Sequence, residues 1–107
     1  MNTPVSFELA KLLKEKGYPF EFITVGELKE VPLNIPTIAE VVMWLYEKYG
    51  IWIVCSQALD TEMATVNLYW FWVAVQEGEE IAYQYFDFKS PTEAYEDGIK
   101  YVLTKLI

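Results

Sequence analysis

The chain has 107 residues, a length that favours one folded domain, and its 53% hydrophobic content argues against intrinsic disorder. Eight lysines against sixteen acidic residues give a formal net charge of −8, which opposes binding to nucleic acid and to anionic membranes. Histidine and arginine are absent and cysteine occurs once. Imidazole-based catalytic triads, histidine-containing metal sites and disulfides within one chain are therefore excluded.

The N-terminal residues do not show the basic and apolar segments of a secretory signal. The longest uninterrupted apolar run, Leu68 to Val75, is far shorter than the roughly 20 residues of a membrane-spanning helix. A single cysteine is typical of a reducing compartment. We therefore expect a cytoplasmic protein.

A first helix is expected near the N-terminus. Thr3 and Pro4 fit its N-cap and first helical position, although Ser6 fits as the cap of a slightly later start. Gly17 predicts its end, because glycine readily adopts the left-handed conformation that closes many helices.

A short alternating strand follows at residues 20–24, and residues 26–36, with one glycine and two prolines, are interpreted as a connection. Thr37 and Glu40 have the spacing of a capping box, which predicts the start of a second helix. Gly50 predicts its end.

Residues 51–57 form the next predicted strand, and residues 58–64 are expected to form a loop. Two further strands, at residues 67–76 and 81–88, are separated by a short acidic segment that contains Gly78, a pattern typical of a β-hairpin. Three consecutive strands joined in this way predict an antiparallel meander.

The register of the hairpin depends on its turn. A two-residue turn at Gly78 and Glu79 pairs Glu77 with Glu80, whereas a three-residue loop changes the pairing. In the first register one face of the hairpin carries Tyr69, Phe71, Val73, Val75, Ala82, Gln84, Phe86 and Phe88. The other face carries Trp70, Trp72, Ala74, Tyr83, Tyr85 and Asp87. We expect the first face to be the core, because the last helix returns directly from Phe88.

Ser90, Pro91 and Glu93 predict the start of the last helix, as cap, first-turn proline and capping-box acid. Gly98 lies on the apolar stripe of this helix, where close packing against a sheet would explain it. The element order is therefore α-β-α-β-β-β-α. We predict one α+β domain over residues 1–107, with a three- to four-stranded antiparallel meander and helices mainly on one face.

Three parts of the chain resemble a group of small uncharacterised proteins from gut Bacteroidetes genomes and their phages. The matching segments are Ala10–Tyr18, Pro36–Thr37 with Trp44–Ile51, and Pro91–Ile99. The resemblance implies a compact α+β domain and a phage or prophage origin. It implies no activity and no catalytic residue.

Carboxylates are the most abundant reactive groups, and two clusters are candidates for a divalent cation. These are Glu93, Glu96 and Asp97 on the last helix, and Glu77, Glu79 and Glu80 at the hairpin turn. Neither has the spacing of a calcium-binding loop, and acids near a helix N-terminus are favourable without any ion. Both clusters are therefore interpreted as solvated surface.

Cys55 lies in an apolar strand, and the chain has no histidine or arginine to stabilise its thiolate. It is interpreted as a buried and inert thiol. No residue is assigned a catalytic, cofactor-binding or metal-binding role, and we expect neither a cofactor nor enzymatic activity.

A protein-interaction or self-association module is the predicted function. The predicted register gathers Trp70, Trp72, Tyr83 and Tyr85 on the face opposite the core, which would form an apolar patch and most simply a homodimer interface. Alternatively, a helix crosses to this side and these rings are ordinary core. An acidic decoy that occupies the nucleic-acid-binding surface of a host protein is the second predicted function, because of the net charge of −8.

Overall fold

A computed structural model describes residues 3–20, 22–26, 29–32, 34–62 and 65–107, and it places their side chains except at 22–25, 29–32, 59–62, 65–68 and 85–87. The elements in chain order are α1 (Phe7–Glu15), β1 (Phe22–Val25), β2 (Lys29–Pro32), α2 (Ile38–Tyr49), β3 (Ile51–Glu62), β4 (Thr65–Gln76), β5 (Glu79–Phe88), α3 (Pro91–Tyr101) and the π-helical η1 (Val102–Leu106).

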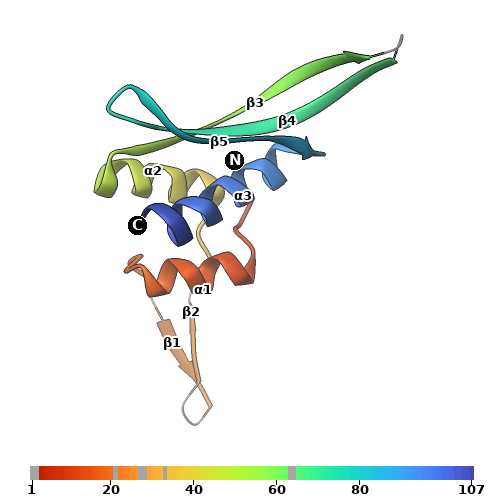
Figure 1. The fold of residues 1–107 in the computed structure, drawn as a ribbon. Coiled ribbons are helices and arrows are strands. Elements are labelled where there is room, and N and C mark those ends of the chain that lie inside the picture. The colour runs from red at the N-terminus through yellow and green to blue at the C-terminus, as the bar shows by residue number, and fades with distance from the viewer. Residues whose placement is uncertain (1–2, 21, 27–28, 33, 63–64) are drawn as a thin grey trace.

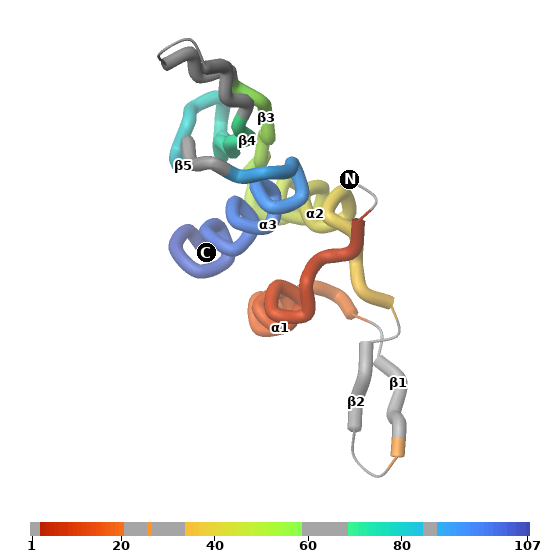
Figure 2. The backbone as a smooth tube through the Cα atoms, turned by 90° about the vertical axis from the view of Figure 1, so that its right-hand side faces the viewer, coloured from red at the N-terminus to blue at the C-terminus, as the bar shows by residue number. Residues whose placement is uncertain are grey.

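The large sheet has the antiparallel order β3-β4-β5, and β1 pairs with β2 in a separate two-stranded sheet. All three α-helices lie on one side of the large sheet (Figure 1). α2 and α3 lie next to it and α1 lies beyond them, so that the sheet, a helix pair and a single helix form three layers (Figures 1 and 2). The predicted α+β fold, a meander with helices on one face, is confirmed.

Two segments are more regular than expected. Residues 26–36, interpreted as a connection, contain β2. Residues 58–64, expected to form a loop, continue β3 as far as Glu62, and residues 63–64 lie outside the described part. Pairing with a long neighbouring strand provides backbone hydrogen bonds at alternate residues of β3, and this outweighs the low strand propensity of Asp60.

The first helix begins later than its first candidate cap. Ser6 is the N-cap of α1, and its hydroxyl oxygen accepts a hydrogen bond from the Leu9 N–H at 3.2 Å. A start at Thr3 is wrong, because Pro4 forms an isolated β-bridge with Thr37. This bridge fastens the N-terminal ends of α1 and α2 together.

The other helix ends follow the predicted cap chemistry, except that Glu93 accepts a hydrogen bond from the Lys89 N–H, one residue before the cap, and not from the N-cap residue Ser90 as a capping box requires. Gly17 closes α1 with a φ of 88°. Thr37 and Glu40 form a reciprocal capping box at the start of α2. Ser90 is the N-cap of α3, and its hydroxyl oxygen accepts a hydrogen bond from the Glu93 N–H at 3.2 Å. These signals act within one helical turn, so they do not depend on the rest of the fold.

The β4–β5 turn lies one residue earlier than predicted. Its two central residues are Glu77 and Gly78, with φ values of 54° and 79°, and Gln76 pairs with Glu79. Two positive φ values are typical of a type I′ turn, whose twist matches that of a hairpin. The predicted turn at Gly78 and Glu79 is therefore wrong.

A bulge then exchanges the predicted faces of β4 and β5. Val75 lies opposite Glu80 and Ala74 lies opposite Ala82, which leaves Ile81 as an extra residue. Moving the turn by one position shifts the partner of every β4 residue by two residues along β5, so the same side chains still share a face. The single extra residue at the bulge shifts the partner by one residue, so each β4 residue now shares a face with the β5 residues predicted to lie on the opposite face.

The consequence is clear at Phe88. This residue contacts the core, as expected, but a second register shift between Trp72 and Trp70 places it opposite Trp70 rather than Tyr69. The helix-facing side of β4 is therefore the side of Trp72, not the side predicted to be the core.

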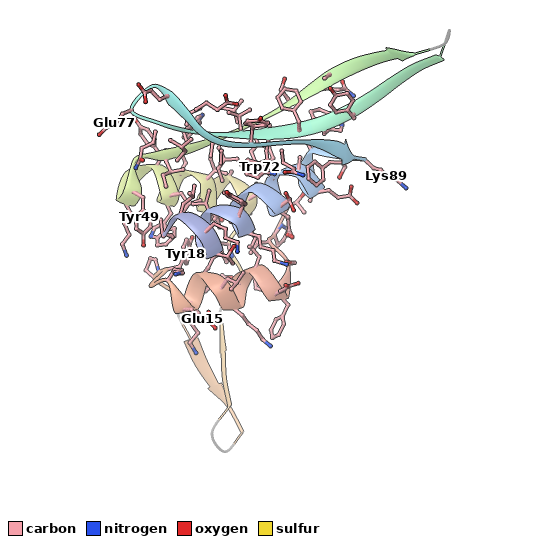
Figure 3. All side chains as sticks on the ribbon, viewed as in Figure 1. Glu15, Tyr18, Tyr49, Trp72, Glu77 and Lys89 are labelled. Atoms are coloured by element: carbon pink, nitrogen blue, oxygen red, sulfur yellow. The ribbon has the colours of Figure 1, made fainter. Side chains whose placement is uncertain are left out.

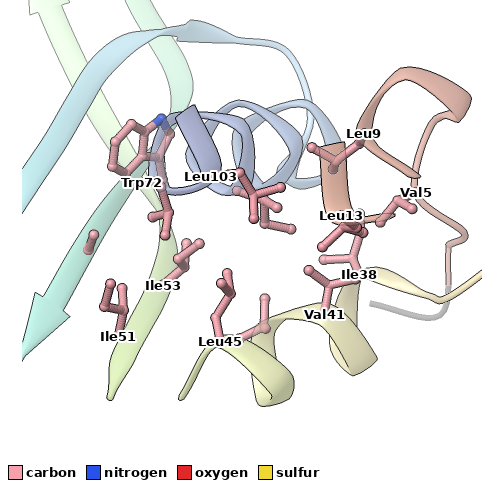
Figure 4. Close-up of a cluster of buried hydrophobic side chains, with 14 of the residues drawn as sticks. Val5, Leu9, Leu13, Ile38, Val41, Leu45, Ile51, Ile53, Trp72 and Leu103 are labelled. Atoms are coloured by element: carbon pink, nitrogen blue, oxygen red, sulfur yellow. The ribbon is translucent and has the colours of Figure 1, made fainter. Parts of the chain in front are cut away.

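The core fills the space between the sheet and the three helices (Figure 4). The close-up shows side chains from β3, β4, α1, α2 and η1 meeting in one continuous cluster. Its most deeply buried large side chains are Leu13, Ile38, Leu45, Ile53, Trp72, Ile99 and Leu103.

Candidate interaction surface

The outer face of the large sheet is the side that points away from the helices. Alternate residues of each strand form it, since successive side chains of a strand point to opposite sides. Its central part comprises Trp52, Val54, Ser56 and Ala58 on β3, Tyr69, Phe71, Val73 and Val75 on β4, and Tyr83 on β5. These nine side chains are all uncharged.

Three of the large hydrophobic side chains in this set are exposed by more than a third of their area. The exposed fractions are 37% for Trp52, 40% for Val54 and 56% for Tyr83. Tyr46 of α2, itself exposed, contacts the Trp52 ring edge-on with 5.4 Å between ring centroids. This aromatic contact extends the outer face towards α2.

Trp72 lies on the inner, helix-facing side, where it is 1% exposed, so its predicted place on the exposed face is wrong. Its indole N–H donates a hydrogen bond to Asp97 Oδ2 at 2.8 Å. Its ring lies against Gly98, where a Cβ atom would come within 3.0 Å of it. Figure 3 shows Trp72 between the sheet and α3. α3 thus provides both an acceptor and a gap for this ring, which confirms that Gly98 packs closely on the sheet.

The other three predicted surface residues are not gathered in one place. Trp70 is half-buried on the inner side, opposite Phe88. Tyr83 is exposed on the outer face. The Tyr85 side chain lies outside the described residues. The structure therefore replaces the predicted set with a surface centred on Trp52, Val54 and Tyr83.

The acidic cluster on α3 holds parts of the chain together. Glu93 accepts a hydrogen bond from the Lys89 N–H at 2.9 Å, and both Glu96 carboxylate oxygens lie 3.1 Å from the Ser6 N–H that donates to them. With Asp97 bound to the indole of Trp72, all three carboxylates accept hydrogen bonds from the chain. Among the described residues, no group of three or more potential ligands is arranged to hold a metal ion.

Cys55 lies on the inner side of β3. Its Sγ atom is 3.8 Å from the Pro91 carbonyl oxygen, and burial raises the pKa of the thiol to about 11. Cys55 is therefore a neutral thiol near neutral pH, in agreement with the interpretation as an inert group.

Within the described ranges, no helix has both the length and the apolar character needed to cross a membrane.

Trp52, Val54 and Tyr46 were not predicted as surface residues. The sequence does contain a signal for which side of β4 faces the helices. Asp97 and Gly98 are adjacent, and together they place a hydrogen-bond acceptor beside a gap on the sheet-facing stripe of α3. This combination fits a buried tryptophan and would have assigned Trp72 to the inner face.

No protein family model matches the chain, and no curated protein or solved structure is detectably similar to it. Its function is therefore inferred from its own surfaces.

Proposed function

We propose that this protein is a non-enzymatic self-association module, in which the outer face of the sheet binds the same face of a second copy. The observation that carries this proposal is the exposure of Trp52, Val54 and Tyr83 on the one sheet face that lies opposite the helices. Trp and Tyr are enriched at the centres of protein interfaces, because they bury a large area at low cost in side-chain entropy.

A second copy fits this face better than an unrelated partner does. Two sheets pack face to face when their twists match, and an identical chain brings an identical twist and an equal area. The nine central side chains are uncharged, and the exposed Glu80, opposite Val75, lies at the turn end of the same face, so two copies place no like charges against each other at the centre.

The size of the face sets the expected strength of the contact. Residues 52–58 of β3 span about 23 Å, and three strands are about 14 Å wide, so the central part of the face covers roughly 300 Å². Two copies would then bury about 600 Å² in total, which is the size of a weak contact. We expect a dimer that dissociates on dilution.

The test is sedimentation equilibrium from micromolar to millimolar concentration. The wild-type protein should associate, and Val54→Glu should be monomeric, because it places two like charges at the centre of the contact. Phe7→Glu is the matched control: it adds the same charge at an exposed site on α1 and should leave association unchanged.

Circular dichroism of each variant shows whether the fold is kept. A monomeric wild-type protein at all concentrations, or a dimer that persists in Val54→Glu, would contradict the proposal.

Salt separates this function from the acidic decoy. Added salt screens the repulsion between two copies that each carry a charge of −8, so self-association should strengthen. A decoy bound to a basic surface would instead lose affinity steeply.

A further inference from the structure

A second surface lies on α2, away from the residues of the outer face. Tyr18 and Pro19, which follow α1, face the α2 residues Met43 and Trp44 across a groove of about 490 Å³. Met43 is exposed by 45%, and Tyr18 and Trp44 are half-buried. The groove therefore offers apolar and aromatic area that a ligand can cover.

The aromatic rings of this groove are fixed by contacts with each other. The Tyr18 and Trp44 rings meet edge-on with 5.1 Å between ring centroids. The Trp44 ring also meets the Tyr49 ring edge-on, with 5.6 Å between ring centroids. The Lys48 ammonium lies 5.3 Å from the Trp44 ring centroid. The cluster is thus a preformed aromatic wall, and the Lys48 ammonium already lies against two of its rings.

Two carboxylates line the groove at its two ends, Glu40 and Glu47. Seven residues separate them on one helix, so they lie on nearly the same side and about 10 Å apart along the axis. Glu40 is held by hydrogen bonds from the N–H and the hydroxyl of Thr37. After burial, Glu40 is the second cause of the raised pKa of Tyr18, which agrees with its position beside that phenol.

This spacing selects a ligand conformation. A polyproline II helix repeats every three residues and rises about 9 Å in that repeat, so side chains at positions i and i+3 lie on one side at nearly the separation of the two carboxylates. Proline-rich segments in this conformation bind grooves lined with aromatic rings, because they are stiff before binding.

We infer that the groove of Tyr18, Trp44 and Met43 binds a polyproline II segment of a partner protein that carries two lysines or arginines three positions apart. The prolines between the cations cover the aromatic wall, and the cations pair with Glu40 and Glu47. A chain with a net charge of −8 attracts such a basic segment and repels an acidic one.

The probe is an acetylated and amidated octapeptide, Pro-Pro-Lys-Pro-Pro-Lys-Pro-Pro, titrated into the full chain by isothermal calorimetry and by amide NMR shifts. We expect saturable binding with shifts centred on α2. The control peptide has the same composition with its two lysines adjacent, and should bind at least threefold more weakly because only one cation reaches a carboxylate at a time.

Three variants locate the site. Met43→Lys should abolish binding, because a lysine at this exposed position lies within reach of both carboxylates and competes with the peptide. Glu47→Gln should weaken binding about threefold, as expected for the loss of one exposed ion pair. Glu79→Gln, the matched control at the β4–β5 turn, changes the net charge equally and should bind as the wild type.

Four results with the octapeptide and the variants would overturn the inference. They are an absence of binding at millimolar peptide, equal affinity for the two peptides, equal weakening by Glu79→Gln, and a loss of self-association in Met43→Lys. The second and third would indicate binding by net charge alone, and the fourth would show a second copy in the groove. A helical peptide with lysines seven positions apart that binds more tightly than the octapeptide would also overturn it.

Discussion

The inner and outer faces of the large sheet are made by the same three strands, yet their tryptophan side chains differ in burial. Trp72 on the inner face is 1% exposed and Trp52 on the outer face is 37% exposed, although both are indoles on neighbouring strands. α3 offers the inner ring an acceptor at Asp97 and a gap at Gly98. An aromatic strand residue is therefore buried in the core when the opposing helix leaves space for its ring and provides a hydrogen-bond acceptor.

The sharpest test of this difference replaces each indole in turn. Trp72→Ala should lower the free energy of unfolding by about 3–5 kcal/mol, because it removes a buried ring and leaves a cavity. Trp52→Ala should lower it by less than about 1 kcal/mol in the monomer, because that site is already partly hydrated. Urea denaturation at low protein concentration measures both. Equal losses would mean that the two faces are energetically alike.

The hydrogen bond on the inner face should contribute next. Asp97→Ala leaves the Trp72 indole N–H without this acceptor, and we expect a loss of about 1–2 kcal/mol. Asp97→Asn keeps an acceptor oxygen at the same place and should recover most of that loss. Thermal or urea unfolding of the two variants provides the comparison, and identical stabilities would show that the bond adds little.

Gly98 tests the gap rather than the hydrogen bond. Alanine favours a helix by about 1 kcal/mol over glycine, so Gly98→Ala should stabilise α3 if nothing opposed it. The added Cβ would lie 3.0 Å from the Trp72 ring, and crowding of this kind costs about 1–3 kcal/mol. We expect a net loss of about 1 kcal/mol, measured by chemical denaturation. A gain in stability would show that the ring moves aside freely.

Cys55 gives the smallest effect and depends on pH. Burial raises the pKa of its thiol from an ordinary 9.0 to about 11 in the folded state, so the unfolded chain loses this proton first as pH rises. Stability from this group is fully present below pH 9 and is lost as pH rises towards 11. Cys55→Ala should show a smaller loss over that interval. Alkylation of Cys55 by iodoacetamide in the folded protein should increase up to about pH 11, and a midpoint near 9 would contradict its burial.

Helix boundaries were predictable because their signals are local. The Thr37–Glu40 capping box, the Ser90 cap and the Gly17 terminus each act within one turn, and all three are present in the structure. The predicted placement of the helices on one face of the sheet is confirmed, but the third layer that α1 forms beyond α2 and α3 was not predicted.

The register was not predictable from the same kind of signal. Glu77 adopts a positive φ, which is uncommon for a residue other than glycine, so Gly78 was assigned to the wrong turn position. The extra residue at Ile81 leaves no mark in composition or periodicity. Since one added residue exchanges the faces of a strand pair, the candidate surface moved from Trp72 to Trp52 and Val54.

The position of α1 has a consequence for how the molecule opens. α1 lies beyond α2 and α3. Among the described residues, it packs mainly on α3 and η1 and not on the large sheet. The bond from the Ser6 N–H to Glu96 and the exposed ion pair of Glu8 with Lys100 hold it at its outer edge. Leu9 and Leu13 tie this layer to the shared core, but it makes no strand pairing, so we expect its amide protons to exchange with solvent through an opening that leaves the strands paired. Slow exchange in β4 together with faster exchange in α1 is the pattern that such a hierarchy produces.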